Sequence, residues 1–511
     1  MKKKSFSMLN VCVSLFLGIF IFSACNQNEG GYSDLVTMIP GNAALVVDID
    51  LQSLGENVTS EQFVASSFYD MANRQTDQRF FELICNDSVK TGIEYDNLVG
   101  FVVSKDEFGA SMHLEDAQVF ESMVEELKDS MGWVVNKSVD EGVKFCMVED
   151  SAVLLIWNDE RALFLTGTTS AQGLAIFEQE LEQSIVSNED FKTFYKDKKE
   201  LAVWIDMENY MEFVGDLPQL KKGMAFPIVS DQKEMYEGMY SSYNVEFLDG
   251  EVVMSGAMRP LSKAKALSKK YYKEHISKEL LSYIPGNSYI LMSAALQFSE
   301  ILEMSSSLPQ FADIINDPKS ADIVASIDGD IIISISDFAS GPLPIPNAVI
   351  GLSVKDEAIF DAIVEMDGVQ KVEKEGYTAL LVQMFQVFVA QKKDLLLIST
   401  NEDIITSFVS GKALDENLTN SKHKKSAEST MYSYVNLDIE QYPAAITTLF
   451  QNKLGKDMAS VNEAVCLEDL TSWYDYGTGE NKTVLALKDK DKNSLKAIFE
   501  MMDAFLAMSE K

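Results

Sequence analysis

Near the N-terminus, Ile39-Pro40-Gly41-Asn42 lead into an apolar run at residues 43–49. Proline fixes φ, whereas glycine and asparagine tolerate positive φ, so these residues predict a turn that opens a β-strand. The same four residues recur at 284–287, again before an apolar run, at 288–294. The offset is 284 − 39 = 245 residues, and a repeat of this kind predicts an internal duplication.

Further matches between the two halves keep the same order along the chain. Residues 113–120 lead into an amphipathic run at 121–127, and residues 354–360 lead into one at 361–366. Short apolar strand candidates then follow in both halves. They are 143–149, 152–157, 162–166 and 201–207 in the first half, and 377–382, 385–390, 394–399 and 431–437 in the second.

This order of segments predicts the fold class and the domains. Neighbouring strands joined by short turns favour antiparallel pairing, with the helices collected on one face of the sheet. We therefore expect an α+β protein with two similar domains of antiparallel sheet. The predicted segments are a signal peptide at 1–25, a short tether at 26–34, a first repeat domain at 35–260, a connecting helix at 261–279 and a second repeat domain at 280–511.

The N-terminus has the pattern of a bacterial lipoprotein signal. Three lysines at 2–4 precede an apolar run at 11–22, and Ser23-Ala24 stand directly before Cys25. The run is too short to span a bilayer, which takes about 20 apolar residues, but it suits the core of a signal peptide. We expect Cys25 to carry acyl chains such as palmitate and to anchor the protein in the membrane. The alternative is a plain secretory signal that is cleaved after small residues.

Composition argues against a nucleic-acid partner. The net charge is −36 at pH 7, whereas phosphate binding needs clustered cations. No arginine follows Arg259, so the second half lacks the residue best suited to bidentate phosphate contacts. With 46% hydrophobic and 24% charged residues, the chain is typical of a globular protein rather than a disordered one.

Residues with distinctive chemistry are scarce. The histidines at 113, 275 and 423 lie in different predicted elements and lack the spacing of metal ligands. The sequence contains no nucleophile elbow, zinc-protease motif, dinucleotide-binding loop or phosphate-binding loop. We therefore expect no cofactor. Three thiols, Cys85, Cys146 and Cys466, would remain beside Cys25 and permit at most one disulfide.

Asp48 and Asp50 are the best candidates for paired carboxylates. They are two residues apart on a predicted strand, so their side chains share a face and would repel each other. Asp206, near the end of another predicted strand, is a further candidate acid. The alternative is that acids at strand ends cap the helices that follow.

Residues 489–500 resemble a calcium-binding loop in part. Asp489, Asp491, Asn493 and Glu500 fall at the first, third, fifth and twelfth positions, where calcium takes oxygen ligands. The sixth position is Ser494, however, and the sharp turn of such a loop requires glycine there. The alternative is that Asn493 or Ser494 caps a helix at 494–508.

Two aromatic-rich segments are candidates for a binding surface. Tyr236 and Tyr240 lie in the first, and Trp473 and Tyr474 lie in the second. Exposed tyrosine and tryptophan stack on sugars or anchor a partner, whereas buried ones fill the junction between elements.

The lipid signal and the repeated Ile-Pro turn, strand and helix give the chain a family resemblance. It resembles a lipoprotein family of Bacteroidetes catalogued only as a domain of unknown function. That resemblance implies no activity and no functional residues. In that phylum, acids directly after the lipidated cysteine tend to mark export to the cell surface. Residues 26–29 contain one acid, which favours the periplasmic face of the outer membrane.

Together these observations predict a non-catalytic lipoprotein of the cell envelope that binds an envelope protein or a polymer such as a glycan. The alternative is a hydrolase of envelope or surface glycan that uses carboxylates such as Asp48 or Asp206. Such an enzyme would need a cleft with two acids roughly 5 to 9 Å apart. A third possibility, a calcium-stabilised surface module, depends on residues 489–500.

Overall fold

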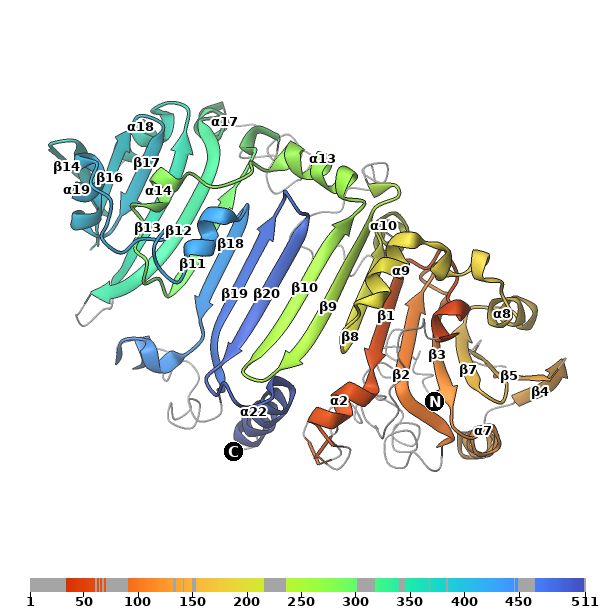
Figure 1. The fold of residues 1–511 in the computed structure, drawn as a ribbon. Helices are drawn as coiled ribbons and strands as arrows, with labels where there is room; N and C mark the ends of the chain where they lie inside the picture. The colour runs from red at the N-terminus through yellow and green to blue at the C-terminus, as the bar shows by residue number, and fades with distance from the viewer. Residues whose placement is uncertain are drawn as a thin grey trace. The chain divides into compact units, whose positions relative to one another are not determined.

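In the computed structural model, the described residues are 34–59, 62–63, 65–66, 69, 91–131, 135–140, 142–148, 153–215, 236–300, 318–339, 345–366, 368–382, 385–444, 446–448 and 465–509. The chain divides into two compact units. One contains residues 1–260 and 489–511, and the other contains residues 261–488. Each unit combines helices with antiparallel strands (Figure 1), which confirms the predicted α+β class.

The strands of the first unit form an antiparallel sheet around β1. They are β1 (Leu45–Asp50), β2 (Ile93–Val102), β3 (Phe108–Leu114), β4 (Val135–Asp140), β5 (Val143–Val148), β6 (Val153–Trp157), β7 (Arg161–Thr166), β8 (Leu201–Asp206), β9 (Tyr240–Leu248) and β10 (Glu251–Arg259). Within β1, Val47 pairs with Gly100 of β2 on one side and with Val203 of β8 on the other. The order across the sheet is β10-β9-β8-β1-β2-β3-β7-β6-β5-β4.

Helices and short 3-10 turns cover this sheet. They are η1 (Asp34–Met38), α2 (Leu51–Asn57), α7 (Ala117–Met131), α8 (Ser170–Phe177), η2 (Leu181–Gln183), η3 (Ile185–Ser187), α9 (Glu189–Lys196), α10 (Met207–Gly215) and α22 (Ser494–Ser509). The predicted turn at Pro40 forms between η1 and β1, where the Ala43 amide donates to the Pro40 carbonyl at 3.0 Å. The turn therefore sets the point at which the chain enters the sheet.

Apolar side chains are buried on both faces of the sheet. Leu98 belongs to one buried cluster and its neighbour Val99 to another, because successive strand residues point to opposite faces. Helices α2, α7 and α22 contribute to the cluster with Leu98, whereas α8 and α9 contribute to the cluster with Val99. The helices of this unit thus differ from the predicted one-sided arrangement. A strand buried on both faces, such as residues 162–165, reads as a continuous apolar run that does not indicate which face a helix covers.

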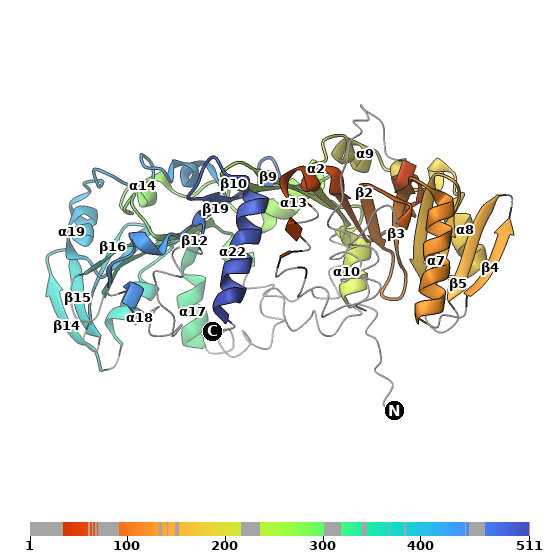
Figure 2. The same cartoon turned by 90° about the horizontal axis from the view of Figure 1, so that it is seen from below.

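The C-terminal helix α22 packs within the first unit. It contacts α2, β9 and β10 (Figure 2). Leu495 and Phe499 of α22 join the cluster with Leu98, and the rings of Phe63 and Phe499 lie 6.0 Å apart between centroids. The predicted second repeat domain ran through residue 511, whereas this last segment completes the core of the first unit.

The strands of the second unit form an antiparallel sheet around β11. They are β11 (Ile290–Ala295), β12 (Ile327–Ala339), β13 (Ile345–Val354), β14 (Gln370–Lys374), β15 (Tyr377–Val382), β16 (Phe385–Lys392), β17 (Leu395–Ser399), β18 (Met431–Asn436), β19 (Leu467–Asp475) and β20 (Glu480–Leu487). The order across the sheet is β20-β19-β18-β11-β12-β13-β17-β16-β15-β14. This is the same order as in the first unit, with every strand number raised by ten.

The helices of the second unit are α13 (Leu261–Tyr271), α14 (Lys278–Leu281), α17 (Pro318–Ala325), α18 (Ala358–Val364) and α19 (Glu402–Ser410), with 3-10 turns η5 (Lys424–Glu428) and η6 (Ile439–Gln441). The predicted connecting helix at 261–279 ends at Tyr271. The Lys273 amide then donates to the Ala295 carbonyl, and the Gln297 amide donates to the Tyr271 carbonyl. These bonds join the chain to the end of β11 and interrupt the helix. Among the described residues, no helix has the length and apolar character to cross a membrane.

Candidate functional site

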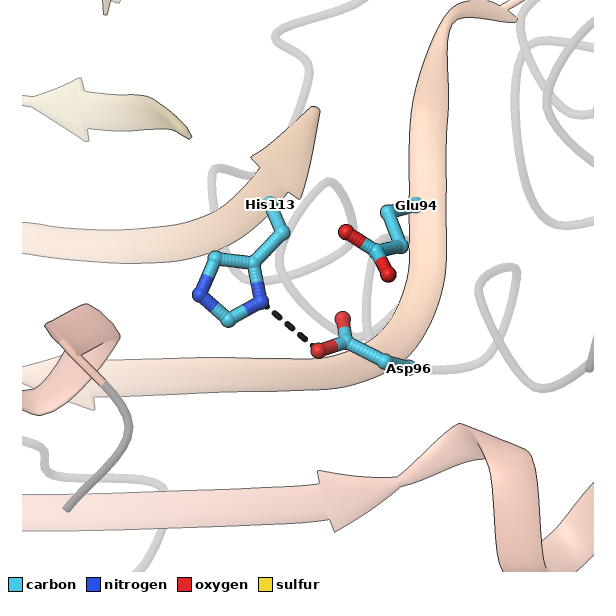
Figure 3. A group of neighbouring side chains, drawn as sticks. All are labelled: Glu94, Asp96 and His113. Carbon is cyan, nitrogen blue, oxygen red and sulfur yellow. Dashed lines mark hydrogen bonds and ion pairs between the residues drawn. The ribbon is translucent and has the colours of Figure 1, made fainter. Parts of the chain in front are cut away.

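A cluster of ionisable side chains lies at an irregularity between β2 and β3. The register pairs Glu94 with His113 and then Leu98 with Met112, so three residues of β2 have no counterpart on β3. A bulge of this kind bends a strand and re-aims its side chains. Figure 3 shows the result: Glu94 and Asp96, from the bent part of β2, gather around the ring of His113.

Both ring nitrogens of His113 contact carboxylates. Nδ1 lies 2.7 Å from Oδ2 of Asp96, and Nε2 lies 2.6 Å from Oδ1 of Asp34 in η1. On the far side of Asp34, a guanidinium nitrogen of Arg161 lies 3.7 Å from Oδ2. One candidate ligand atom each from Glu94, Asp96 and His113 lie within 4.8 Å of one another. The cluster therefore joins η1, β2, β3 and β7.

The charges in the cluster shift its pKa values strongly. Burial opposes protonation of His113, but hydrogen bonds and charges from Asp34 and Asp96 outweigh it and raise the pKa of His113 to about 10. The hydrogen bond with His113 lowers the pKa of Asp34. Burial, followed by the negative charge of Asp96, raises the pKa of Glu94. In this arrangement His113 is an imidazolium held between two carboxylates, with a third carboxylate close by.

The predicted acid pair divides into two separate structural roles. Asp50 is the N-cap of α2 and accepts from the Ser53 amide at 2.8 Å. Asp48 is 2% exposed; it accepts from the Tyr195 hydroxyl at 2.5 Å and from Lys198 Nζ at 2.8 Å. Both carboxylates thus make structural contacts within the first unit.

The carboxylate of Asp206 also has a structural role. It stands directly before α10 and accepts from the Asn209 amide at 3.1 Å and from the Asn209 side-chain amide at 3.1 Å. Burial raises its pKa despite these hydrogen bonds. A carboxylate in this position caps the first turn of a helix, as the alternative interpretation of strand-end acids expected.

The predicted calcium loop has the geometry of a helix start. Oδ1 of Asn493 accepts from the Leu495 amide at 3.0 Å and so caps α22. Glu500 forms an ion pair with Lys492, and Oδ1 of Asp489 accepts from the Asp491 amide at 3.1 Å. The side chains of Asp489, Asn493 and Glu500 therefore bind partners within the protein, and among the described residues the four candidate ligands do not gather into a group that could hold a metal ion.

The aromatic candidates pack against neighbours of their own unit. Tyr240 stacks on the buried Trp204 with ring centroids 4.9 Å apart. The Tyr474 hydroxyl lies 2.6 Å from the Ser268 hydroxyl, and Lys482 Nζ lies 5.9 Å from the ring of Trp473. Tyr236 is half-buried just before β9. The predicted lipidation residue, Cys25, lies outside the described residues.

The cluster of carboxylates around His113 was not predicted from the sequence. Asp34 is 79 residues from His113 along the chain, and Asp96 is 17 residues away. The spacing Glu94-x-Asp96 was the available signal, but acids two apart are common on exposed strands. Only the register of β2 against β3 shows that both acids meet a histidine.

The fold is of the mixed α and β type and is built on antiparallel sheets. Within that class, residues 36–495 match the family model described as Domain of unknown function (DUF4836). The match spans most of the chain, so the protein belongs to this family, and the resemblance found in the sequence is confirmed. Neither curated proteins nor solved structures gave a match to this chain.

Proposed function

We propose that this protein is a non-catalytic lipoprotein, anchored through Cys25 to the periplasmic face of the outer membrane, that binds another protein of the envelope. The anchor rests on the N-terminal pattern of lysines, apolar run, small residues and cysteine. The binding role rests on one surface of the second unit.

The observation that carries the binding role is a row of exposed aliphatic side chains, which we call the aliphatic row. Met292, Ile333 and Ile350 lie side by side on β11, β12 and β13, because Met292 pairs with Ile333 and Ile333 pairs with Ile350. Their exposed fractions are 56%, 41% and 37%. Contiguous exposed apolar side chains mark interaction sites more often than single ones do.

The opposite face of the same three strands is fully buried. Leu291, Ile332 and Val349, each the preceding residue on its strand, are 0% exposed. The aliphatic row is therefore a second apolar face on a sheet whose core is already complete on the other side. Aliphatic side chains suit the apolar surface of a protein better than a glycan, which is bound through aromatic stacking and hydrogen bonds.

The described contacts of Asp48 and Asp206 do not favour the alternative glycan hydrolase. Asp48 and Asp206, the acids expected to act in it, contact a lysine, a tyrosine and helix amides within the first unit. A hydrolase needs one carboxyl free to donate a proton and a second free to attack or to activate water. The binding role is therefore the better proposal.

We also infer that the two units arose by internal duplication. The identical strand order around β1 and β11 supports it, as do the Ile-Pro-Gly-Asn turns that precede both strands. The two cores differ in one respect, since α22 supplies Leu495 and Phe499 to the first unit alone. On this proposal, the aliphatic row is a specialisation of the second copy.

Site-specific photo-crosslinking in intact cells tests the binding role. A photoreactive amino acid replaces Met292 or Ile333, and the control carries it at Val372 on β14, which is 59% exposed in the same unit. We expect the same protein adduct from both positions in the row and none from 372, with mass spectrometry identifying the partner. Equal labelling at all three positions, or no adduct from the row, would contradict the proposal.

A further inference from the structure

We propose that Glu94, Asp96 and His113 bind a divalent transition-metal ion of the zinc type, with Asp34 and Arg161 supporting the site. This inference is independent of the proposed binding role, because the cluster lies in the first unit and the aliphatic row lies in the second. It rests on the ligand set, on the outer hydrogen bond to the histidine and on the charge of the cluster.

The ligand set is one imidazole and two carboxylates from neighbouring strands. Their candidate ligand atoms lie within 4.8 Å of one another (Figure 3). In a tetrahedral zinc site, bonds of about 2.0–2.2 Å place ligand atoms about 3.3–3.6 Å apart. The 2.7 Å separation between His113 Nδ1 and Asp96 Oδ2 would thus need to open by about 0.6–0.9 Å. Glu94 is exposed, so water has access to a fourth position.

The hydrogen bond between His113 and Asp34, which is not one of the three ligands, fixes which ring nitrogen of His113 would bind the ion. A histidine that ligates a metal usually donates its other ring N–H to a carboxylate, which holds the ring in place and makes it more basic. Asp34 occupies that position, with Oδ1 at 2.6 Å from Nε2 of His113. Arg161, paired with His113 across β3 and β7, lies 3.7 Å from the other oxygen of Asp34. Nδ1 therefore faces Asp96 and Glu94.

The charge of the cluster also favours a divalent cation. An imidazole that ligates a metal is neutral. With a neutral His113, the three carboxylates and the Arg161 guanidinium sum to −3 + 1 = −2. A divalent ion would offset this charge and bring the sum to −2 + 2 = 0. The ion would also lie between the carboxylates of Glu94 and Asp96, whose like charges otherwise repel each other.

The same ligand set discriminates among cations. Calcium and magnesium prefer oxygen ligands and leave imidazole unused, whereas zinc, manganese and cobalt accept both imidazole and carboxylate. Because its ligand set includes a histidine, this site differs in metal preference from the calcium loop predicted at residues 489–500. Zinc is the natural probe, and cobalt is its spectroscopic substitute.

Titration of the metal-free, full-length protein in detergent micelles with zinc chloride tests the proposal. We expect one equivalent to bind with micromolar affinity or better, and cobalt to give a visible absorption band. His113→Asn should abolish binding, and Glu94→Gln or Asp96→Asn should weaken it at least tenfold. Asp34→Asn should weaken it roughly 10- to 100-fold, as expected for a positioning residue.

His275→Asn is the matched control, because His275 is exposed, lies 3.7 Å from Glu274 and joins no metal-holding group among the residues that the structure describes. It should leave the zinc affinity unchanged. Near-ultraviolet circular dichroism of every variant checks the fold. If Asp96→Asn unfolds the first unit, the zinc affinity of Glu94→Gln decides the test instead, because Glu94 is exposed. Absence of binding up to millimolar zinc, or equal affinity in wild type and His113→Asn, would overturn the proposal.

Discussion

At the scale of single residues, His423 is buried in an environment unlike that of His113. It is 0% exposed, and its Nδ1 lies 3.1 Å from the Tyr432 hydroxyl. The ring lies 4.4 Å from that of Tyr434 between centroids, and the hydroxyl of Tyr434 accepts from Lys422. Burial, reinforced by the charge of Lys422, lowers the pKa of His423 to about 4. This histidine is therefore neutral in the folded protein at neutral pH.

This pKa predicts a loss of stability in mild acid. The unfolded chain takes up a proton on His423 below its ordinary pKa of about 6.5, whereas the folded chain does so only near 4. The contribution of this group is complete above pH 6.5 and is lost as the pH falls towards 4, at roughly 3 kcal/mol in total. Urea unfolding between pH 7 and 4.5 should show a steeper decline for wild type than for His423→Gln. Parallel declines would contradict this prediction, and His275→Gln serves as the exposed control.

Single residues also differ in how far their roles could be predicted from the sequence. The hydrogen bonds of Asp50 and Asn493 confirm that both residues cap helices. These caps were predictable because a cap binds an amide only three residues away along the chain. The partners of Asp48 and His113 were not predictable in this way. Lys198 is 150 residues from Asp48, and Asp34 is 79 residues from His113. Such contacts depend on sheet register, which local patterns do not specify.

At the scale of elements, the turn between β9 and β10 holds the chain that leads into α22. The Gly250 amide donates to the Lys492 carbonyl at 2.9 Å, and the Asn493 side-chain amide donates to the Phe247 carbonyl at 2.8 Å. Gly250 has φ +76°, and a Cβ there would lie 2.8 Å from the backbone of Lys490. Glycine is thus required for two reasons: the left-handed backbone and the close approach of another segment.

Gly250→Ala and Gly142→Ala separate these two reasons. Gly142, in the turn before β5, has φ +92°, and a Cβ added there would meet no heavy atom within 4 Å. Both variants should lose about 1 kcal/mol from the left-handed backbone. Gly250→Ala should lose at least about 1 kcal/mol more, because the segment at Lys490 must move. Urea denaturation followed by circular dichroism measures both, and equal losses would show that the close approach contributes nothing.

Several strands and the C-terminal helix were predicted closely, since the helix expected at 494–508 corresponds to α22. The candidates at 143–149, 377–382 and 431–437 correspond to β5, β15 and β18, each within one residue at either end. A short apolar run between turns marks a strand on its own. By contrast, the connecting helix at 261–279 is broken, because its second half bonds to β11. The bulge that bends β2 at Glu94 was likewise missed, since no local residue type announced it.

At the scale of the whole molecule, the first unit is built from two separated parts of the chain. Residues 1–260 supply the sheet, and residues 489–511 supply α22, whose Leu495 and Phe499 enter the core. The second unit, residues 261–488, is continuous. The predicted repeat domains followed one another in chain order. The return of α22 to the first unit was not predictable, because an amphipathic helix does not specify the sheet it covers.

Deletion of residues 489–511 tests this division. We expect the first unit to lose several kcal/mol of stability, because the loss of two large apolar side chains opens its core. The second unit, with an uninterrupted chain, should keep its own unfolding transition. Differential scanning calorimetry should therefore show one transition shifted or lost and one retained. A uniform shift of the whole profile would argue against this assignment of α22.

The return of α22 also has a consequence for the order of events during synthesis. A ribosome makes the chain from the N-terminus, so the residues of the first unit emerge before those of the second. Yet Leu495 and Phe499 are added only after residues 261–488, the second unit, have been made. The unit whose chain emerges first can therefore complete its core only after the second unit has followed.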